Sequence, residues 1–202
     1  YRSKKPVFGE ITARIPITFE LTFWSMLVAI IIAIPIGVIS ATKQYSLTDS
    51  ISMIATLLAA AVPHFWLGLM LIIWFSLKLG WLPSGGADGI KSMILPAITL
   101  GTGAAAIVTR MTRSSMLEVV RQDYIRTAKA KGVNKKVVIR KHALRNALIP
   151  IVTVVGLQFG HMLGGAVLTE TVFSLPGMGR LMVDSIKSKD TPMVLGCIII
   201  LA

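Results

Sequence analysis

The run Leu21–Ala41 reads LTFWSMLVAIIIAIPIGVISA and contains no charged residue. A bilayer core needs about 20 mostly apolar residues in helical form, so this run predicts a membrane-spanning helix. The whole chain fits the same solvent, because 54% of its 202 residues are apolar and 15% are charged, against about 45–50% and about 25% in soluble domains. Its mean hydropathy of +0.74 agrees. The sequence therefore predicts an all-α, polytopic membrane helix bundle.

Further runs of the same kind predict the rest of the bundle. The expected spans are Leu21–Ala41, Ile51–Leu79, Ile94–Met111, Ala147–Thr169 and a shortened run, Met193–Ala202. The second is about 43 Å long at a helical rise of about 1.5 Å per residue, so we expect one tilted helix kinked at Pro63. We interpret residues 1–202 as a single membrane domain.

The basic residues predict how the chain is oriented. Lys and Arg outnumber Asp and Glu by 21 to 9, and the stretch from Arg110 to Arg145 carries +9 of the net +12. Because cytoplasmic loops are enriched in Lys and Arg, we place this stretch and Lys43 in the cytoplasm. Residues 1–20 are then outside although they are basic too. One further span before Tyr1 would resolve this conflict, and we expect it.

The cytoplasmic segment 112–146 has the signals of a helical corner. Residues Glu118–Lys131 are good helix formers with an acid near the start and cations near the end. Gly132 is placed to end this helix as a C-cap glycine, and Asn134 to begin a second helix over Lys135–Asn146. The pattern predicts a helix, a glycine corner and a helix between two spans.

Several functions fit a basic helical corner at a membrane. It could lie on anionic lipid headgroups or simply determine topology. Nucleic-acid binding fits poorly, because Tyr124 is the segment's one aromatic residue. A corner held between two membrane helices is also suited to be gripped by a cytoplasmic partner through a helix-in-groove contact. The residues by themselves leave these alternatives open.

A longer string makes the chain recognisable. Residues Gln122–Thr153, QDYIRTAKAKGVNKKVVIRKHALRNALIPIVT, resemble the signature cytoplasmic loop of the dipeptide, oligopeptide and nickel permease family of bacterial ABC importers. In that loop Arg126–Ala128 takes the place of a Glu-Ala-Ala motif, Gly132 that of its glycine, and His142–Arg145 that of its last four positions. The resemblance continues through Tyr1–Leu21, Pro63–Gly68, Leu79–Pro83, Gly164–Ala166 and Glu170–Leu181.

The resemblance implies a type I ABC importer permease fold and a set of residues that couple the chain to a separate ATPase. These coupling residues would be Asp123, Tyr124, Arg126, Thr127, Ala128, Lys131, Gly132, His142, Leu144 and Arg145. An outer gate or binding-protein contact would be formed by Glu170, Phe173, Pro176, Gly177 and Gly179.

The resemblance also implies the chain's partners. They would be a second homologous permease, two ATP-binding subunits, an extracytoplasmic substrate-binding protein and membrane lipid, in the bacterial inner membrane. ATP and Mg would be bound by the partner subunits, and this chain would have no cofactor, metal or catalytic residue. The absence of a Gly-x-x-x-x-Gly-Lys-Ser/Thr loop from the sequence agrees. The cargo would be di- or oligopeptides, with nickel or a metal chelate as the alternative.

Polar residues inside the spans are candidates for the translocation pathway, because they are costly in lipid. His64 lies beside Pro63 and Phe65, and Gln158 and His161 share one helix face at i and i+3. These side chains would either form hydrogen bonds between helices or line the pathway. Two histidines on different spans make a poor metal site, although imidazole is a ligand that suits nickel.

Other features leave further alternatives open. Gly156, Gly160 and Gly164 recur every four residues, which allows close helix packing within the chain or against a second permease. An intramembrane hydrolase would need paired membrane carboxylates or a nucleophile motif, and the sequence has neither. An ion-coupled secondary transporter would need mid-membrane carboxylates, which are missing as well.

Replacing both His64 and His161 by Ala distinguishes the two roles of these side chains. If they line the pathway, uptake of labelled dipeptide per folded protein falls. Unchanged uptake would rule out the pathway role, and a loss confined to stability would indicate interhelical hydrogen bonds.

Overall fold

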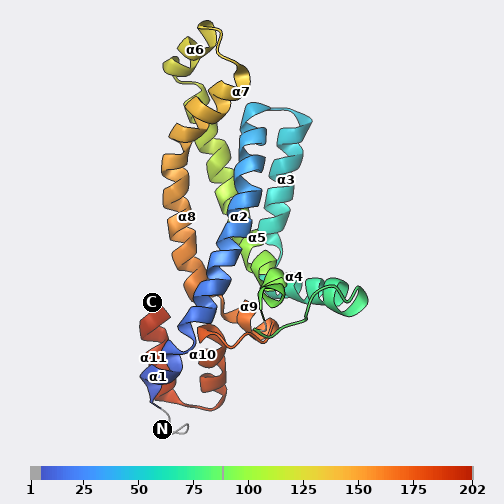
Figure 1. Cartoon of the computed structure of the whole chain (residues 1–202), viewed down its shortest axis with the longest axis vertical. Helices are drawn as coiled ribbons and strands as arrows, with labels where there is room; N and C mark the ends of the chain where they lie inside the picture. Colours follow the sequence, from blue (N-terminus) through green and yellow to red (C-terminus); the bar gives the residue numbers. More distant parts are fainter. Residues whose placement is uncertain (1–5, 88, 202) are drawn as a thin grey trace. The chain divides into compact units, whose positions relative to one another are not determined.

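A computed structural model describes residues 6–87 and 89–201, and every regular element in these ranges is a helix. Figure 1 shows the course of the chain. The α-helices are α1 (Val7–Thr12), α2 (Ile15–Thr42), α3 (Leu47–Ala61), α4 (His64–Leu71), α5 (Ile90–Val120), α6 (Asp123–Ala130), α7 (Lys135–Val137), α8 (Arg145–Gly165), α9 (Val167–Val172), α10 (Met178–Lys187) and α11 (Thr191–Leu201). Two π-helical segments, η1 (Ile72–Lys78) and η2 (Val138–Leu144), extend α4 and α7. The all-α prediction is confirmed.

Three helical stretches are long and apolar enough to cross a membrane among the described residues: Val7–Thr42, Ile90–Val120 and Lys135–Gly165. The broken pair of α3 with α4 and η1 makes a fourth if it counts as one span. The sequence predicted a kinked helix here, but α3 ends at Ala61 and α4 begins at His64. Pro63 has extended backbone angles, φ −62° and ψ 131°, and it disfavours a helical residue before it. The proline therefore breaks the helix instead of bending it.

The chain forms two compact units. Unit 1 contains residues 1–28, 62–102 and 159–202, and unit 2 contains residues 29–61 and 103–158. The chain passes from one unit to the other at four places. Three of these places lie inside α2, α5 and α8, which is unlike domains joined by exposed linkers. The units also separate the charges. Lys43 and the cations from Arg110 to Arg145 belong to unit 2, whereas Arg14, Lys91, Arg180, Lys187 and Lys189 belong to unit 1.

Unit 2 contains a close approach between α2 and α5. A Cβ atom added to Gly37 would lie 2.5 Å from Cβ of Thr112, so only glycine fits at this crossing. The nearby hydroxyls are paired within their own helix, because Thr109 donates to the carbonyl of Ala105 and Thr112 to that of Val108. Small residues are typical of helix contacts in membranes, because they let the two backbones approach closely.

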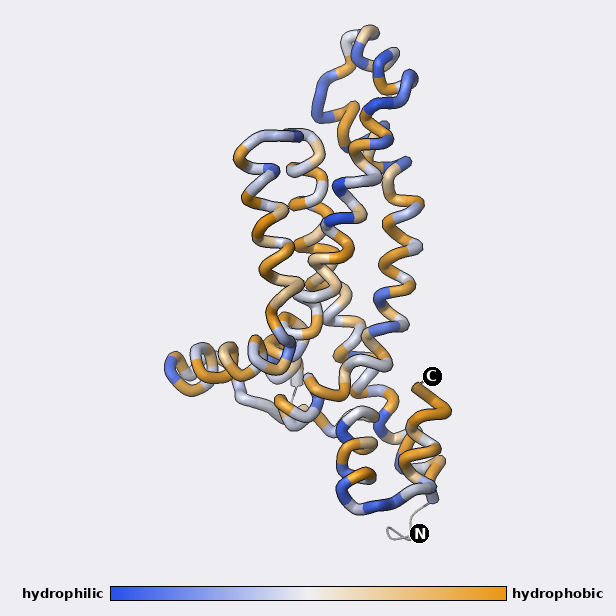
Figure 2. Tube along the Cα trace, turned by 180° about the vertical axis from the view of Figure 1, so that it is seen from behind, coloured by the Kyte–Doolittle hydropathy of each residue, from blue (hydrophilic) through white to orange (hydrophobic). Residues whose placement is uncertain are grey.

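Unit 1 has its own apolar cluster, where α1, α10 and α11 meet. It contains the buried side chains of Ile11, Met178, Leu181, Met193 and Cys197. These five residues come from both ends of the sequence, and α11 contacts both α1 and α10. Figure 2 shows that hydrophobic residues also continue along the long helices, whereas hydrophilic residues gather around α6 and α7.

The Gly37 contact predicts the effect of a single methyl group. Gly37→Ala should lower the free energy of unfolding by about 1–3 kcal/mol, because the methyl group would overlap Thr112. Gly156→Ala is the matched control in the same unit, because a Cβ there would meet no atom within 4 Å. Alanine favours helix over glycine by about 1 kcal/mol, so this control should unfold no more easily than the parent protein. Unfolding in detergent checks both, and equal destabilisation would contradict the contact.

Candidate functional site: the coupling segment and the outer segment

The basic segment 112–146 in unit 2, named the coupling segment after its predicted role, forms the expected corner. Helix α6 ends in a Schellman motif, in which Gly132 N–H donates to the carbonyl of Lys129 and Val133 N–H to that of Ala128. Gly132 has a φ of +76°, which side chains other than Asn and Asp rarely adopt. The Asn134 side chain then accepts a hydrogen bond of 2.9 Å from Lys136 N–H. The predicted glycine corner and N-cap are therefore confirmed.

Two local details of this segment differ from the prediction. The sequence predicted one helix over Glu118–Lys131, but α5 ends at Val120 and α6 begins at Asp123. Gln122 between them is extended, with φ −69° and ψ 150°, so the first turn of α6 starts anew. The second predicted helix exists and runs into α8, but Val138–Leu144 is π-helical.

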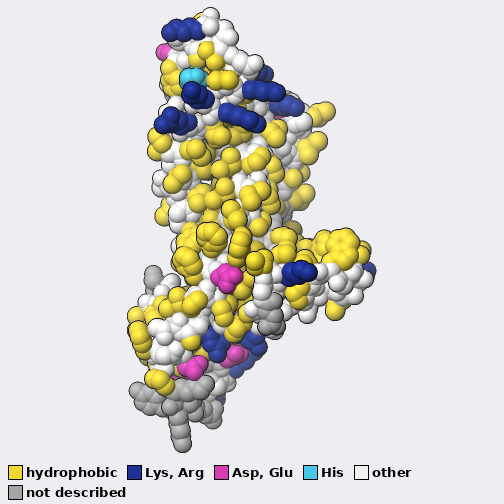
Figure 3. Space-filling view, in the orientation of Figure 1, with side chains coloured by type: hydrophobic (Ala, Val, Ile, Leu, Met, Phe, Trp, Pro, Cys, Tyr) yellow, Lys and Arg dark blue, Asp and Glu magenta, His cyan; other side chains and the backbone are white. Residues whose placement is uncertain are grey.

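Helix α6 presents a mostly exposed surface. Among the predicted coupling residues Asp123, Tyr124, Arg126, Thr127, Lys131, Gly132 and Arg145 are exposed, and Ala128, His142 and Leu144 are half-buried. Figure 3 shows Lys and Arg side chains gathered over this end of unit 2. Such a surface can bind a partner that offers acidic or polar groups.

Ile125 attaches α6 to its neighbours. Its side chain is fully buried, and it lines a cavity of about 200 Å³ together with Val120, Val138 and Ala143. Helix α6 contacts η2 at this place. The sequence analysis did not identify Ile125, although it is the one aliphatic side chain larger than Ala in the polar helix α6.

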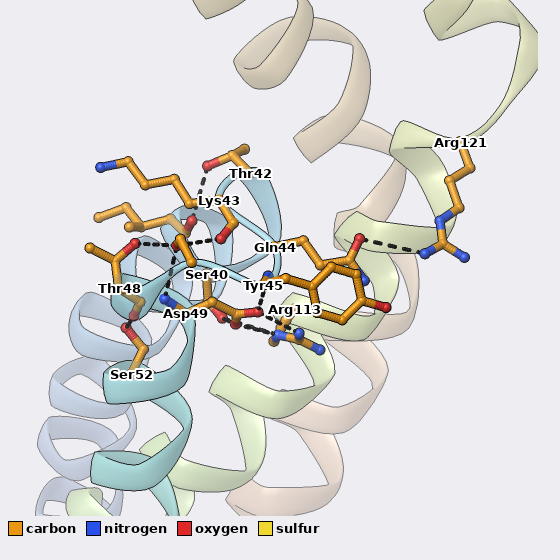
Figure 4. A network of polar contacts seen from close by, with 12 residues as sticks. Ser40, Thr42, Lys43, Gln44, Tyr45, Thr48, Asp49, Ser52, Arg113 and Arg121 are labelled. Carbon is orange, nitrogen blue, oxygen red and sulfur yellow. Dashed lines mark hydrogen bonds and ion pairs between the residues drawn. The ribbon is translucent and has the colours of Figure 1, made fainter.

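A buried ion pair joins α3 to α5 where the chain turns from α2 into α3 (Figure 4). Arg113 donates from Nε to Oδ1 and from Nη2 to Oδ2 of Asp49, both at 2.8 Å. Ser40 donates to Oδ1, and the backbone N–H of Tyr45 donates to Oδ2 at 3.0 Å. Side-chain exposure is 6% for Asp49 and 24% for Arg113, so the pair is largely shielded from solvent.

This ion pair, with its two further donors, is called here the α3–α5 clasp. It fixes the turn between α2 and α3, where Tyr45 has a φ of +62°. It also fixes the last turns of α5, the helix that leads directly into α6. A second contact, from Arg121 Nη2 to Gln44 Oε1 at 3.5 Å, joins the same two segments. The clasp therefore fixes the end of the helix that leads into the coupling segment.

The outer segment, residues 170–189 in unit 1, buries most of the side chains that were predicted to form a gate or contact. Glu170, Phe173, Gly177 and Gly179 are buried, and Pro176 is half-buried. Glu170 accepts from the Thr18 hydroxyl at 2.6 Å and from the backbone N–H of Arg180 at 3.0 Å. The structure thus gives these residues an internal packing role, and their predicted role at a gate stays a prediction.

The pathway candidates lie on the surface of the described chain. His64, Phe65 and His161 are exposed and Gln158 is half-buried. Residues 6–87 and 89–201 contain no group of three or more His, Cys, Asp or Glu side chains that could hold a metal ion. The structure does not bring the two histidines together into a common site.

Known proteins resemble the chain over most of its length. The family pattern described as "Binding-protein-dependent transport system inner membrane component" matches residues 33–202. A dipeptide transport system permease protein, DppB of Alkalihalophilus pseudofirmus, is 46% identical over 100% of this chain and 69% of its own length. Glutathione transport system permease proteins, GsiC, are 48% identical in Pectobacterium atrosepticum and 46% in Escherichia coli K12. Each of these two covers 95% of this chain, and the chain spans 63% of their length.

Solved structures share the fold. A chain of the MetNI methionine ABC transporter, in inward-facing conformations, superimposes with a TM-score of 0.82 over 98% of this chain and 90% of its own. An amino acid ABC transporter crystallised with histidines gives 0.69 over 96% and 86%. The sequence identities are 19% and 16%, so these likenesses concern the fold alone. They confirm the expected type I importer permease fold.

The α3–α5 clasp predicts a large difference between two ion pairs of unit 2. Asp49→Ala should lower the free energy of unfolding by about 3 kcal/mol, because it leaves Arg113 shielded and unpaired. Asp123→Ala is the matched control, because its pair with Arg126 is 95% and 76% exposed and is worth about 0–1 kcal/mol. Unfolding in detergent, with Arg113→Ala and the double variant completing the cycle, measures the coupling. A coupling energy near zero for Asp49 and Arg113 would contradict the clasp.

Proposed function

The chain belongs to the family of inner-membrane components of binding-protein-dependent transport systems, and we propose that it is the permease subunit of an ATP-driven importer of dipeptides and oligopeptides. The relatives named above are dipeptide and glutathione permeases, and glutathione is itself a small peptide. These names favour peptide cargo over nickel or a metal chelate. Membership of a binding-protein-dependent family likewise favours an ATP-driven importer over an ion-coupled secondary transporter.

The observation that carries this proposal is the exposed corner formed by α6 and Gly132. It projects Tyr124, Arg126 and Thr127 to the surface of unit 2, while Ile125 and the α3–α5 clasp hold it to the spans. A rigid, surface-exposed lever joined to membrane helices can transmit the movement of a partner. The partner we infer is a separate ATP-binding subunit that binds ATP and Mg and performs the hydrolysis.

The remaining partners follow from the same proposal. Two ATP-binding subunits would serve two permeases, and an extracytoplasmic binding protein would deliver the peptide to the outer segment. Two glycines of the α8 face support a second permease, because a Cβ at Gly156 or Gly160 would meet no described atom within 4 Å, whereas one at Gly164 would contact the backbone of Leu201. The two permeases would form the pathway in the lipid of the bacterial inner membrane, and alternating access would move the cargo.

Gly132 provides a test of the coupling role with a conformationally matched control. Gly132→Val should reduce transport about tenfold, because a β-branched residue strains the corner at a φ of +76°. Gly132→Asn should transport at close to the parental rate, because Asn tolerates this conformation. Transport and ATP hydrolysis are measured in proteoliposomes that contain the complete complex.

Membrane insertion and assembly of both variants are checked first, and ATP hydrolysis should continue in Gly132→Val without matching transport. Full transport by Gly132→Val would contradict a coupling role for the corner.

A further inference from the structure

Glu170 is a fully buried carboxylate in unit 1. It lies on α9, yet its partners come from two other helices. The Thr18 hydroxyl of α2 donates to Oε1 at 2.6 Å, and the backbone N–H of Arg180 on α10 donates to Oε2 at 3.0 Å. The backbone N–H of Gly179 is a further donor. One side chain thus joins α2, α9 and α10.

Thr18 completes the arrangement because it serves α10 as well. Its oxygen accepts a hydrogen bond of 2.9 Å from the backbone N–H of Met178 while its hydroxyl donates to Glu170. The first N–H groups of a helix have no partner within the helix, so α10 depends on these two side chains for its N-terminal bonds. Thr18 is 3% exposed, so water does not replace it.

The loop before α10 packs closely around this carboxylate. A Cβ atom added to Gly177 would lie 2.3 Å from Cδ of Glu170, so any other residue would displace the carboxylate or the loop. The Pro-Gly-Met-Gly turn therefore packs directly against the side chain of Glu170. An ordinary flexible connector would not need such a fit.

The surroundings of Glu170 contain groups that disfavour the charged form of its carboxyl and groups that favour it. Burial keeps the pKa of the Glu170 carboxyl above its usual value, although the hydrogen bonds from Thr18, Arg180 and Gly179 and the charge of Arg14 act to lower it. The N-terminal end of α10 also carries partial positive charge that favours a carboxylate. Burial of this group is tolerated because all of these donors face it together. They can do so in one position of α10 only, so the group fixes where α10 lies.

We propose that Glu170 and Thr18 form a latch that positions α10 on α2, and that this latch sets the outer surface to which the substrate-binding protein docks. The exposed side of α10 contains Asp184, Ile186 and Lys187, and Thr171 on α9 and Ser174 in the turn that follows α9 are exposed as well. The sequence between residues 170 and 189 is too polar to cross lipid, so this surface faces water. Glu170 and Thr18 are positioning residues, because both are buried and neither can touch the binding protein.

The inference rests on the proposed function, and a kinetic split tests it. Binding-protein-stimulated ATP hydrolysis is measured in the reconstituted complete complex as a function of binding-protein concentration. Thr18→Val and Glu170→Gln should raise the half-saturating concentration about tenfold, because α10 is displaced. In Thr18→Val the maximal stimulated rate and the basal rate should stay within about twofold, because the coupling segment belongs to unit 2.

Two controls separate positioning from general structure. Thr22→Val removes a buried hydroxyl one turn along the same helix, but that hydroxyl bonds only the carbonyl of Thr18, so the half-saturating concentration should not change. Thr18→Ser keeps the donor and the acceptor and should behave like the parent.

Each outcome decides the matter. An unchanged half-saturating concentration in Thr18→Val and Glu170→Gln would overturn the latch, whether or not the maximal rate falls. A shift of equal size in Thr22→Val would also overturn it, because it would indicate general disturbance of α2. A parental complex whose ATP hydrolysis ignores the binding protein would instead refute the proposed function.

Discussion

The structure depends on one constraint, that a polar group in an apolar surrounding must find its partner within the protein. The hydroxyls of Ser25, Thr99 and Thr109 meet it locally, because each donates to the carbonyl four residues earlier in its own helix. No buried side-chain nitrogen or oxygen lacks a hydrogen-bond partner in the part of the chain that the structure describes. A carboxylate cannot pair in this way, because it has no hydrogen to donate to a backbone carbonyl and needs donors from elsewhere. Asp49 and Glu170 therefore determine which helices must come together.

The two carboxylates act as tertiary tethers. Asp49 is joined to a residue 64 positions away, and Glu170 to one 152 positions away. Between helices in lipid, apolar contact gives little net preference for one partner over another, so packing of small residues and polar pairs decide the arrangement. Each tether belongs to a different unit: Asp49 binds the helix that leads into the coupling segment, and Glu170 lies within the outer segment. Both candidate surfaces are therefore built on a buried ionisable group, although neither group is itself exposed.

The sequence predicted the features that depend on neighbouring residues. Apolar runs predicted the helices, and Gly132 and Asn134 predicted the corner, because a C-cap glycine and an N-cap side chain act within a few residues. It did not predict the extended Gln122 or the π-helical Val138–Leu144, which depend on how α6 and η2 pack through Ile125. The sequence also did not predict the pairs Asp49–Arg113 and Glu170–Thr18. A single sequence gives the chemical type of each group and not which distant group it will meet.

The two tethers are structurally independent. The hydrogen bonds of Asp49 lie within unit 2 and those of Glu170 within unit 1, so neither set depends on the other. Helices α2, α5 and α8 pass through both units, and the break between α3 and α4 is the fourth connection. Each of the three helices has a proline in its interior, Pro35, Pro96 and Pro150 respectively. Proline removes a backbone hydrogen bond and eases bending at that point. Pro96 belongs to unit 1, and Pro35 and Pro150 belong to unit 2, so bending at any one of them falls within a single unit and leaves the hydrogen bonds of the other unit's tether intact.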